Sequence, residues 1–255
     1  MSHAEPEKLL DARSLSSLQN LIRSKTGIYL LEREFKSYER QILPFMRENG
    51  FQNIKELIES LEKGRPGIVQ KTVDLFICRE TFFFRDPSLY KMLEETLLPP
   101  LLAQKDTGKS LRIWSAACST GEEPYSLAIF MKEKFAKTPV EILGTDLSAD
   151  TVDKAKLGIY PQEKITPHIP KNLLSPYFRP LNGDFQICTG IRQMVRFQIH
   201  NLLNPLESSA LFDVILCRNV LSSFEGSLKA KVLDAFVTHL TRDGLLILGS
   251  HEILL

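Results

Sequence analysis

The sequence predicts an all-α amino-terminal domain followed by an α/β domain that is built on a parallel sheet and carries a small antiparallel insertion. Three observations support this prediction. Helix caps and helical apolar spacing dominate the first hundred residues. After residue 110, short apolar strands alternate with amphipathic helices, which is typical of a parallel sheet covered on both faces. Residues 159–192 form a stretch rich in Pro, Asn and Gly that is too long for a simple crossover.

Capping residues and helix breakers divide the first hundred residues into helices. Ser, Asn and Asp side chains accept hydrogen bonds from the free N–H groups of a first helical turn, and Gly readily takes the conformation that ends a helix. We expect helices from Ser14 to Gly27, from Glu32 to Asn49, from Asn53 to Gly64, from Gly67 to Cys78, and from the Asp86-Pro87 pair to the Pro99-Pro100 break.

The remainder of the chain alternates strands with helices. The expected parallel strands cover Leu111–Ser115, Val140–Thr145, Val195–His200, Asp213–Cys217 and Leu245–Gly249. The expected helices cover Pro124–Lys137, Ser148–Gly158 and Glu225–Leu240. Inside the insertion, the Asn182-Gly183 pair is typical of a tight turn, so Tyr177–Arg179 and Phe185–Cys188 are expected to form a hairpin.

Composition excludes several classes of function. The 255 residues include 32 Lys and Arg against 31 Asp and Glu, and a net charge of +1 provides no global attraction for nucleic acid or anionic lipid. No stretch approaches the roughly 18 apolar residues of a membrane span, and residues 1–8 hold no apolar run, which favours a cytoplasmic protein. The four cysteines form no CxxC pair, so we expect reduced thiols and no metal site.

The first predicted strand runs into a loop of small residues, 115–121, followed by Glu122, Glu123 and Pro124 at the start of a helix. Small side chains let the backbone approach a ligand closely, and the amino end of the helix offers free N–H groups. The loop differs from the GxGxxG pattern, because Gly121 is its single glycine. Two carboxylates repel phosphate and attract an ammonium group. The loop therefore fits a nucleoside ligand without phosphate.

Asp146 follows the second strand, twenty-five residues after Gly121. Dinucleotide folds place the acid that binds ribose hydroxyls about 20 residues beyond their glycine loop. A ribose site beside an ammonium site fits S-adenosylmethionine, which joins adenosine to an amino acid. The alternative is that Asp146 caps the helix that begins near Ser148.

Five segments carry a resemblance to a known family. They are Arg112 to Ala128 (RIWSAACSTGEEPYSLA), Thr81 to Arg85 (TFFFR), Gly144 to Ser148 (GTDLS), His200 to Leu203 (HNLL) and Phe212 to Val220 (FDVILCRNV). In this order they resemble the chemotaxis receptor glutamate methyltransferases, the CheR family. The resemblance implies a helical domain over residues 1–86, a linker helix and loop over 87–110, and a Rossmann-like S-adenosylmethionine methyltransferase domain over 111–255 with a small β-subdomain inserted at about 159–192.

The same resemblance implies the ligand residues, matched motif by motif. Glu122 would hold the methionine ammonium group and Asp146 the ribose hydroxyls. Arg85 is the candidate catalytic residue, because it would steer the substrate carboxylate. The full cofactor set implied for S-adenosylmethionine, or its product S-adenosylhomocysteine, is Arg79, Thr81, Arg85, Glu122, Asp146, Asn201, Leu202, Arg218 and Asn219.

Several of these residues have an alternative structural role. Arg85 could pair with Asp86 or Glu80 at the surface, Asn201 could be a turn residue at a strand end, and Arg218 could form a buried ion pair. The aromatic run from Phe82 to Phe84 is expected to fill the core.

A basic stripe on the second helix suggests a partner. At 100° per residue, its members fall within an arc of roughly 60°, nearly opposite the apolar face. They are Arg33, Lys36, Arg40 and Arg47. The stripe could be a solvated face, or it could dock on the acidic cytoplasmic helices of a chemotaxis receptor. We expect a monomer that does not insert into the membrane.

The sequence departs from the family at the predicted site. Arg79 stands where the family usually has asparagine, and Ser222-Ser223 stands where it commonly has an aliphatic residue and tyrosine. These departures leave an alternative function, a catalytically weak regulatory module that binds S-adenosylmethionine. A nucleic-acid methyltransferase is disfavoured by the neutral charge and by the absence of its usual motifs.

Overall fold

The computed structural model describes residues 12–28, 35–76, 80–106, 108–207, 211–250 and 252. The chain divides into two compact units, residues 1–78 with 223–228 and residues 79–222 with 229–255. Residues 80–86, which the sequence prediction placed in the helical domain, lie in the second unit.

The first unit is a group of short helices. Its helices are α1 (Ala12–Thr26), α2 (Phe35–Glu48), α3 (Ile54–Glu62) and α4 (Pro66–Phe76). The predicted cap of α3 is confirmed, since the Asn53 side chain accepts a hydrogen bond from the Glu56 N–H. The apolar faces of the helices meet in a core that includes Leu18, Ile42 and Leu57.

The second unit begins with a helical stretch that differs from the prediction. It consists of α5 (Pro87–Met92), the π-helical turn η2 (Leu93–Leu97) and α6 (Leu98–Ala103). The prediction that Pro99-Pro100 ends the helix is wrong. These prolines fall in the first turn of α6, which continues directly from the π-helical turn η2, so the helical path runs past them.

The central sheet of the second unit is parallel, as predicted. In the described residues its strands are ordered β6-β2-β1-β7-β8, and each neighbouring pair is parallel. The strands are β1 (Leu111–Ala116), β2 (Val140–Asp146), β6 (Val195–Ile199), β7 (Phe212–Cys217) and β8 (Leu240–Leu248), so β8 begins five residues before the predicted strand. Because β1 continues to β2 on one side and β7 lies on its other side, the switch in strand order falls beside β1.

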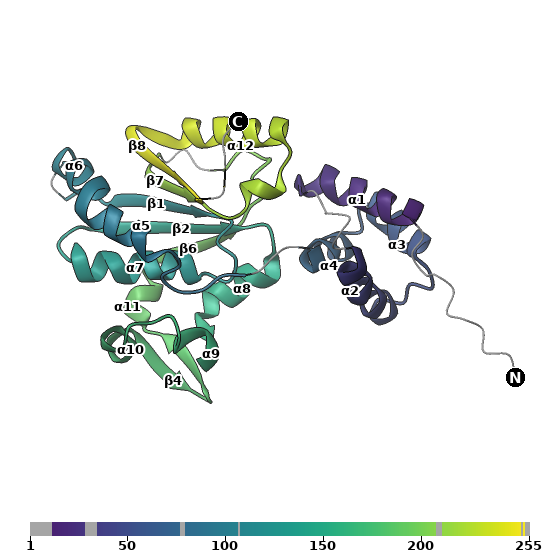
Figure 1. Cartoon of the computed structure of the whole chain (residues 1–255), viewed down its shortest axis with the longest axis horizontal. Helices are drawn as coiled ribbons and strands as arrows, with labels where there is room; N and C mark the ends of the chain where they lie inside the picture. Colours follow the sequence, from purple (N-terminus) through teal and green to yellow (C-terminus); the bar gives the residue numbers. More distant parts are fainter. Residues whose placement is uncertain are drawn as a thin grey trace, which may run out of the picture. The chain divides into compact units, whose positions relative to one another are not determined.

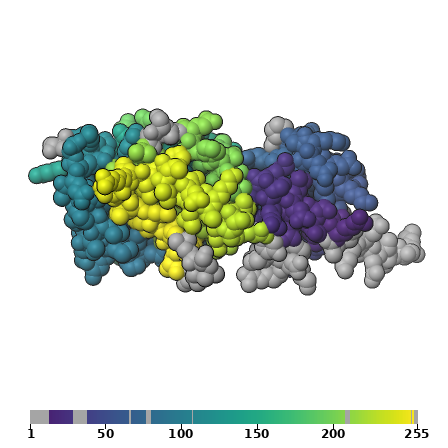
Figure 2. All heavy atoms as spheres, turned by 90° about the horizontal axis from the view of Figure 1, so that it is seen from above, coloured from purple at the N-terminus to yellow at the C-terminus, as the bar shows by residue number. Residues whose placement is uncertain are grey.

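Helices cover both faces of this sheet, α7 (Glu122–Lys134) and α8 (Ala149–Leu157) on one side and α12 (Gly226–His239) on the other (Figure 1). Successive residues of β1 point to opposite faces. Ile113 belongs to the core beneath α7, while the ring of Trp114 packs 5.1 Å from that of Phe236 in α12. Atoms of α12 and β8, coloured yellow-green to yellow, occupy the middle of the visible face of this unit in Figure 2, beside teal atoms from residues near 100. The predicted Rossmann-like fold is confirmed.

The insertion forms the expected small antiparallel sheet, ordered β3-β5-β4. Its elements are β3 (Ile159–Tyr160), α9 (Gln162–Ile165), α10 (Lys171–Tyr177), β4 (Phe178–Leu181), β5 (Asp184–Ile187) and α11 (Thr189–Arg192). The predicted turn is confirmed, because Asn182 and Gly183 have positive φ values of 50° and 90° between β4 and β5.

Two further predictions concern the whole chain. Within the described residues, Cys118, Cys188 and Cys217 are free thiols, as expected, and Cys78 lies outside these residues. In the same part of the chain, no helix combines the length and the apolar character needed to cross a membrane.

Candidate functional site

The loop between β1 and α7 has an unusual backbone. Ala117 and Ser119 have positive φ values of 57° and 50°, which strain residues other than glycine. Two hydrogen bonds hold the loop against the end of β2: the Cys118 N–H donates to the carbonyl of Thr145 (2.9 Å), and the Ser119 N–H donates to Asp146 Oδ2 (2.8 Å). The loop shape therefore depends on the neighbouring strand.

Glycine is required where this loop enters α7. Gly121 has φ 93°, and an added Cβ would lie 2.9 Å from the Cβ of Ala155 and 3.1 Å from the ring of Phe197. The backbone can approach α8 and β6 this closely only without a side chain.

Asp146 organises the segments on both sides of its own strand end. The residue is 4% exposed, and its carboxylate accepts hydrogen bonds from the Ser119 N–H, the Ser148 N–H and the Thr151 hydroxyl. The cap of α8 is Ser148, whose hydroxyl accepts from the Thr151 N–H. Asp146 thus joins the strained loop to the start of α8, and its ribose role stays a prediction.

The two consecutive glutamates of α7 face different neighbours. Glu122 is fully buried and pairs with Lys164 of α9, 3.0 Å away, while the Thr120 hydroxyl donates to its other oxygen. Glu123 instead accepts hydrogen bonds from the Ser115 hydroxyl (2.7 Å) and from Arg218 (3.0 Å). The sequence pointed to both carboxylates as attracting an ammonium group, and the family motif selected Glu122 alone as the cofactor residue. Helix geometry separates the two side chains, because successive residues of a helix point about 100° apart and so meet different neighbours.

Arg218 connects three segments at the end of β7. Its side chain is 4% exposed and forms ion pairs with Glu123 and with Asp86. The buried ion pair that was the alternative for Arg218 is therefore present. The predicted capping role of Asp86 is wrong, because Asp86 makes no side-chain cap bond to α5 and its carboxylate turns to Arg218.

Burial sets the protonation of Glu123. Desolvation raises the pKa of this carboxyl to about 7, although the Ser115 hydrogen bond and the charge of Arg85 lower it. Desolvation also lowers the pKa of the Arg218 guanidinium, as does nearby Arg85. A buried carboxyl that titrates near neutrality is a mark of functional sites.

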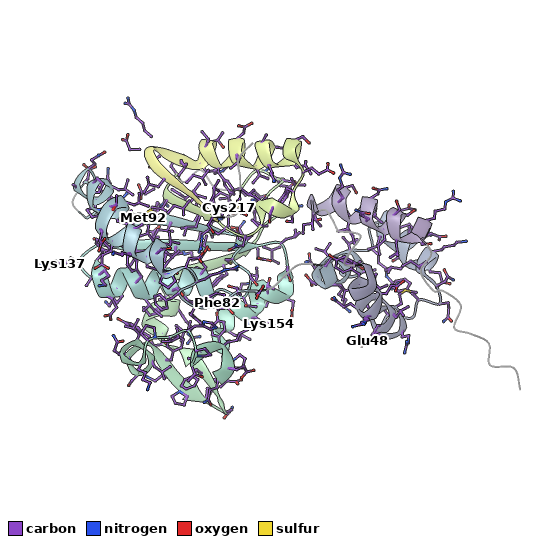
Figure 3. All side chains as sticks on the ribbon, in the orientation of Figure 1. Glu48, Phe82, Met92, Lys137, Lys154 and Cys217 are labelled. Atoms are coloured by element: carbon purple, nitrogen blue, oxygen red, sulfur yellow. The ribbon has the colours of Figure 1, made fainter. Side chains whose placement is uncertain are left out.

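The segment 80–86 contributes Arg85. Its guanidinium donates to the carbonyl of Glu80 (3.0 Å) and lies 5.4 Å from the centre of the Phe82 ring, which stacks on His168 at 4.5 Å. Phe82 is labelled in Figure 3. Of the expected core aromatics, Phe83 is 1% exposed. Thr81 is half-buried in the same segment, and Arg79 lies outside the described residues.

The remaining predicted residues follow β6 and β7. Leu202 is buried, and Asn201 makes a turn in which its side-chain oxygen accepts a hydrogen bond from the Leu203 N–H. Asn219 is exposed, with φ 61°. Because carboxyl ends of parallel strands meet at one edge, the fold brings the β1 loop, Asp146, the 201–202 turn and the 218–219 loop together there.

Backbone strain concentrates at this edge. Among the described residues, positive φ outside glycine occurs at Phe84, Asp86, Ala117, Ser119, Asn182 and Asn219. All but the hairpin residue Asn182 belong to segments that carry candidate site residues. Such strain persists where the surrounding structure enforces it, often at functional sites.

The basic stripe lies in the first unit. Arg40 and Arg47 are exposed on α2, opposite the buried Ile42 and Met46. Arg33 lies outside the described residues, as does the side chain of Lys36.

Comparisons with known proteins identify relatives across most of the chain. Residues 79–255 match the family model described as "CheR methyltransferase, SAM binding domain". The chain is 33% identical over 247 residues to the chemotaxis protein methyltransferase of Borreliella burgdorferi, covering 93% of this chain and 87% of that protein. It is 35% identical over 217 residues to chemotaxis protein methyltransferase 1 of Pseudomonas aeruginosa, covering 82% and 78%. A solved SAM-dependent methyltransferase from Geobacter sulfurreducens with S-adenosyl-L-homocysteine has 14% identity and a TM-score of 0.38, covering 66% and 50%.

The titration of Glu123 can be tested by stability. Between the ordinary value of 4.5 and about 7, the folded protein binds a proton on Glu123 more tightly than the unfolded chain does. This residue therefore lowers the free energy of unfolding as pH rises through that window. Glu123→Gln cannot ionise, so its free energy of unfolding relative to wild type is expected to increase with pH, by about 3 kcal/mol in all.

Urea unfolding at a series of pH values measures this difference. The exposed Glu163 provides a matched control, and Glu163→Gln is expected to follow the wild-type pH curve. A Glu123→Gln curve parallel to the wild-type curve from pH 4.5 to 7 would contradict the assigned titration.

Proposed function

This chain belongs to the CheR family of S-adenosylmethionine-dependent chemotaxis methyltransferases, and we propose from that premise that it methylates glutamate side chains on the cytoplasmic helices of chemotaxis receptors. The observation that carries the proposal is the gathering of Asp146, Glu123, Arg218 and the small-residue loop at one edge of the parallel sheet. We further propose that the protein works in the cytoplasm as a monomer.

The residues at this edge fit S-adenosylmethionine. The loop backbone is shaped by small residues, and the buried hydroxyl of Ser119 has no hydrogen-bond partner among the described residues. A buried hydroxyl without a partner is costly, and a ligand atom would satisfy it. In this proposal Asp146 holds the ribose, Glu123 faces the amino acid end, and Asn201 and Leu202 flank the adenine. Glu122, whose other neighbour is Lys164, holds the methionine ammonium group in the same proposal.

Methyl transfer to a carboxylate requires the protein to orient the two reactants and requires no general base. When bound, S-adenosylmethionine supplies a methyl group carried on a positively charged sulfur. A substrate glutamate, with a pKa of about 4.3, is already a carboxylate at neutral pH and needs no general base. One of its oxygens forms the new bond to the methyl carbon as the carbon–sulfur bond breaks, and the electron pair of that bond stays on sulfur. The products, an ester and a thioether, are neutral at the reacting atoms.

The chain's own residues then have two tasks. Arg85 attracts and orients the incoming carboxylate, which is the kind of positioning that accounts for a large part of many rate accelerations. Phe82 and Phe83 belong to the same segment, and their packed rings limit the access of water to the site. A drier site favours a step in which opposite charges neutralise each other.

A methyl-transfer assay tests the proposal. The protein is incubated with radiolabelled S-adenosylmethionine and membranes that contain chemotaxis receptors, and the labelled receptor is then treated with alkali. Carboxyl methyl esters release labelled methanol in base, whereas N-methyl groups do not. Base-labile receptor labelling is the expected result. Binding of S-adenosylhomocysteine without any labelling would instead support the regulatory module.

Substitution of Arg85 tests its role in the same assay. Arg85→Ala is expected to lower the rate about 100-fold, because the carboxylate is no longer held in line with the methyl group. Arg85→Lys keeps the charge but loses the planar fork, so its loss should be smaller. Arg112, at the other end of β1 and half exposed, provides the control Arg112→Ala. Equal rates for Arg85→Ala and this control would exclude the steering role.

We also propose that the basic stripe docks on the acidic receptor helices. Arg40→Glu with Arg47→Glu is expected to lower receptor methylation about tenfold at low salt, and less at high salt, because exposed charges are screened. Calorimetric affinity for S-adenosylhomocysteine should not change. A matched pair of reversals, Lys55→Glu on an exposed position of α3 with Lys63→Glu at the exposed residue that follows it, controls for net charge. If both double variants methylate receptors equally, the stripe is a solvated face.

A further inference from the structure

A single carboxylate ties together the loops that follow β7 and β8. Glu252 is 9% exposed, and its Oε1 accepts hydrogen bonds from the backbone N–H groups of Val220 (2.7 Å) and Leu221 (2.6 Å). Its Oε2 accepts from the Gly249 N–H (2.7 Å). None of the roles assigned above uses this residue.

The loop held by Glu252 is the one that carries the end of the candidate site. Arg218 and Asn219 lie between the last residue of β7 and the two N–H groups that Glu252 accepts. Asn219 has φ 61°, a conformation that an isolated chain would rarely keep. An external constraint is therefore needed to maintain it.

The neighbouring loop is shaped to admit the carboxylate. An added Cβ on Gly249 would lie 2.8 Å from Glu252 Oε2 and 3.1 Å from the Asn219 nitrogen. Glycine is thus required at the point where the two loops and the carboxylate meet. An ionised carboxylate is also the suitable acceptor here, because it accepts on both oxygens and donates nothing.

We propose that Glu252 is a positioning residue, a clamp that fixes Arg218 and Asn219 for cofactor binding by holding the backbone of the 218–221 loop against the end of β8. The clamp follows from contacts within this structure, whereas its effect on the cofactor rests on the proposed function.

The clamp also acts electrostatically on the site. The negative charge of Glu252 raises the pKa of Glu123, adding to the effect of burial, and raises the pKa of Arg218. The other charges that face Glu123 are those of Arg218 and Arg85, and Tyr90, Cys118 and Cys217 lie within electrostatic range. Removing the Glu252 charge should therefore move the midpoint of Glu123 to lower pH, which the loss of a purely structural contact would not do.

The experiment compares Glu252→Gln with Asp243→Asn, a control on an exposed position of β8. Glutamine offers one acceptor oxygen, so its NH₂ group must oppose at least one of the three N–H groups. In the ligand-free protein, amide exchange at Val220, Leu221 and Gly249 is expected to accelerate about tenfold or more in Glu252→Gln, while amides of β1 keep their protection. Asp243→Asn should exchange like wild type.

Two further measurements connect the clamp to the site. Calorimetry should show an affinity for S-adenosylhomocysteine about tenfold weaker in Glu252→Gln. The pH curve of stability that reports Glu123 should have its midpoint at lower pH. If Glu252→Gln does not fold, Gly249→Ala tests the same clamp, because its Cβ displaces the carboxylate without removing the charge.

The outcomes separate the two proposals. Wild-type protein that binds no S-adenosylhomocysteine overturns the proposed function, and the exchange data then decide the clamp alone. Unchanged amide exchange in the variants overturns the clamp. Faster exchange with unchanged affinity and an unchanged Glu123 midpoint overturns its positioning role, and the three expected changes together support it.

Discussion

The candidate site depends on one buried cation. Arg218 is held between Glu123 and Asp86, and these three residues come from the end of β7, the start of α7 and the segment before α5. A guanidinium withdrawn from water this completely needs carboxylate partners, because unpaired burial of a charge is costly. Asp86 makes its contact with Arg218 from a left-handed backbone conformation, and Glu123 makes its contact from the first turn of α7.

This arrangement is not optimised for stability. Several residues at the sheet edge hold strained backbone conformations, and Glu123 remains in a position where desolvation opposes its charge. The core beneath tolerates these costs because it is well packed, with Trp114 of β1 and Tyr125 of α7 among the largest fully buried side chains of the described residues. Strained loops at the carboxyl edge, supported by a densely packed core, are the arrangement expected of a functional edge on a parallel sheet.

Sequence reasoning succeeded where the signal is local. Apolar runs located the strands within a few residues, and Asn182-Gly183 located the hairpin, because periodicity and turn chemistry depend on near neighbours. Sequence reasoning failed where residues far away in the chain determine which partner a side chain contacts. Asp86 has the residue type and position of a cap, yet Arg218, 132 residues away, takes its carboxylate. Glu122 and Glu123 are equivalent in sequence and are distinguished only by Lys164 and Arg218, 42 and 95 residues away.

The same charge distribution bears on how a substrate carboxylate would be recognised. Arg218 already faces two carboxylates, so its attraction for a third is largely cancelled. Lys164 is likewise paired with Glu122. The direct contacts of Arg85 are of another kind, a backbone carbonyl and the face of an aromatic ring, and its charge acts on Glu123 without an ion pair between the two in the described residues. In the proposed function, an approaching glutamate is therefore attracted mainly to Arg85, while Arg218 pairs with the two carboxylates of its own site.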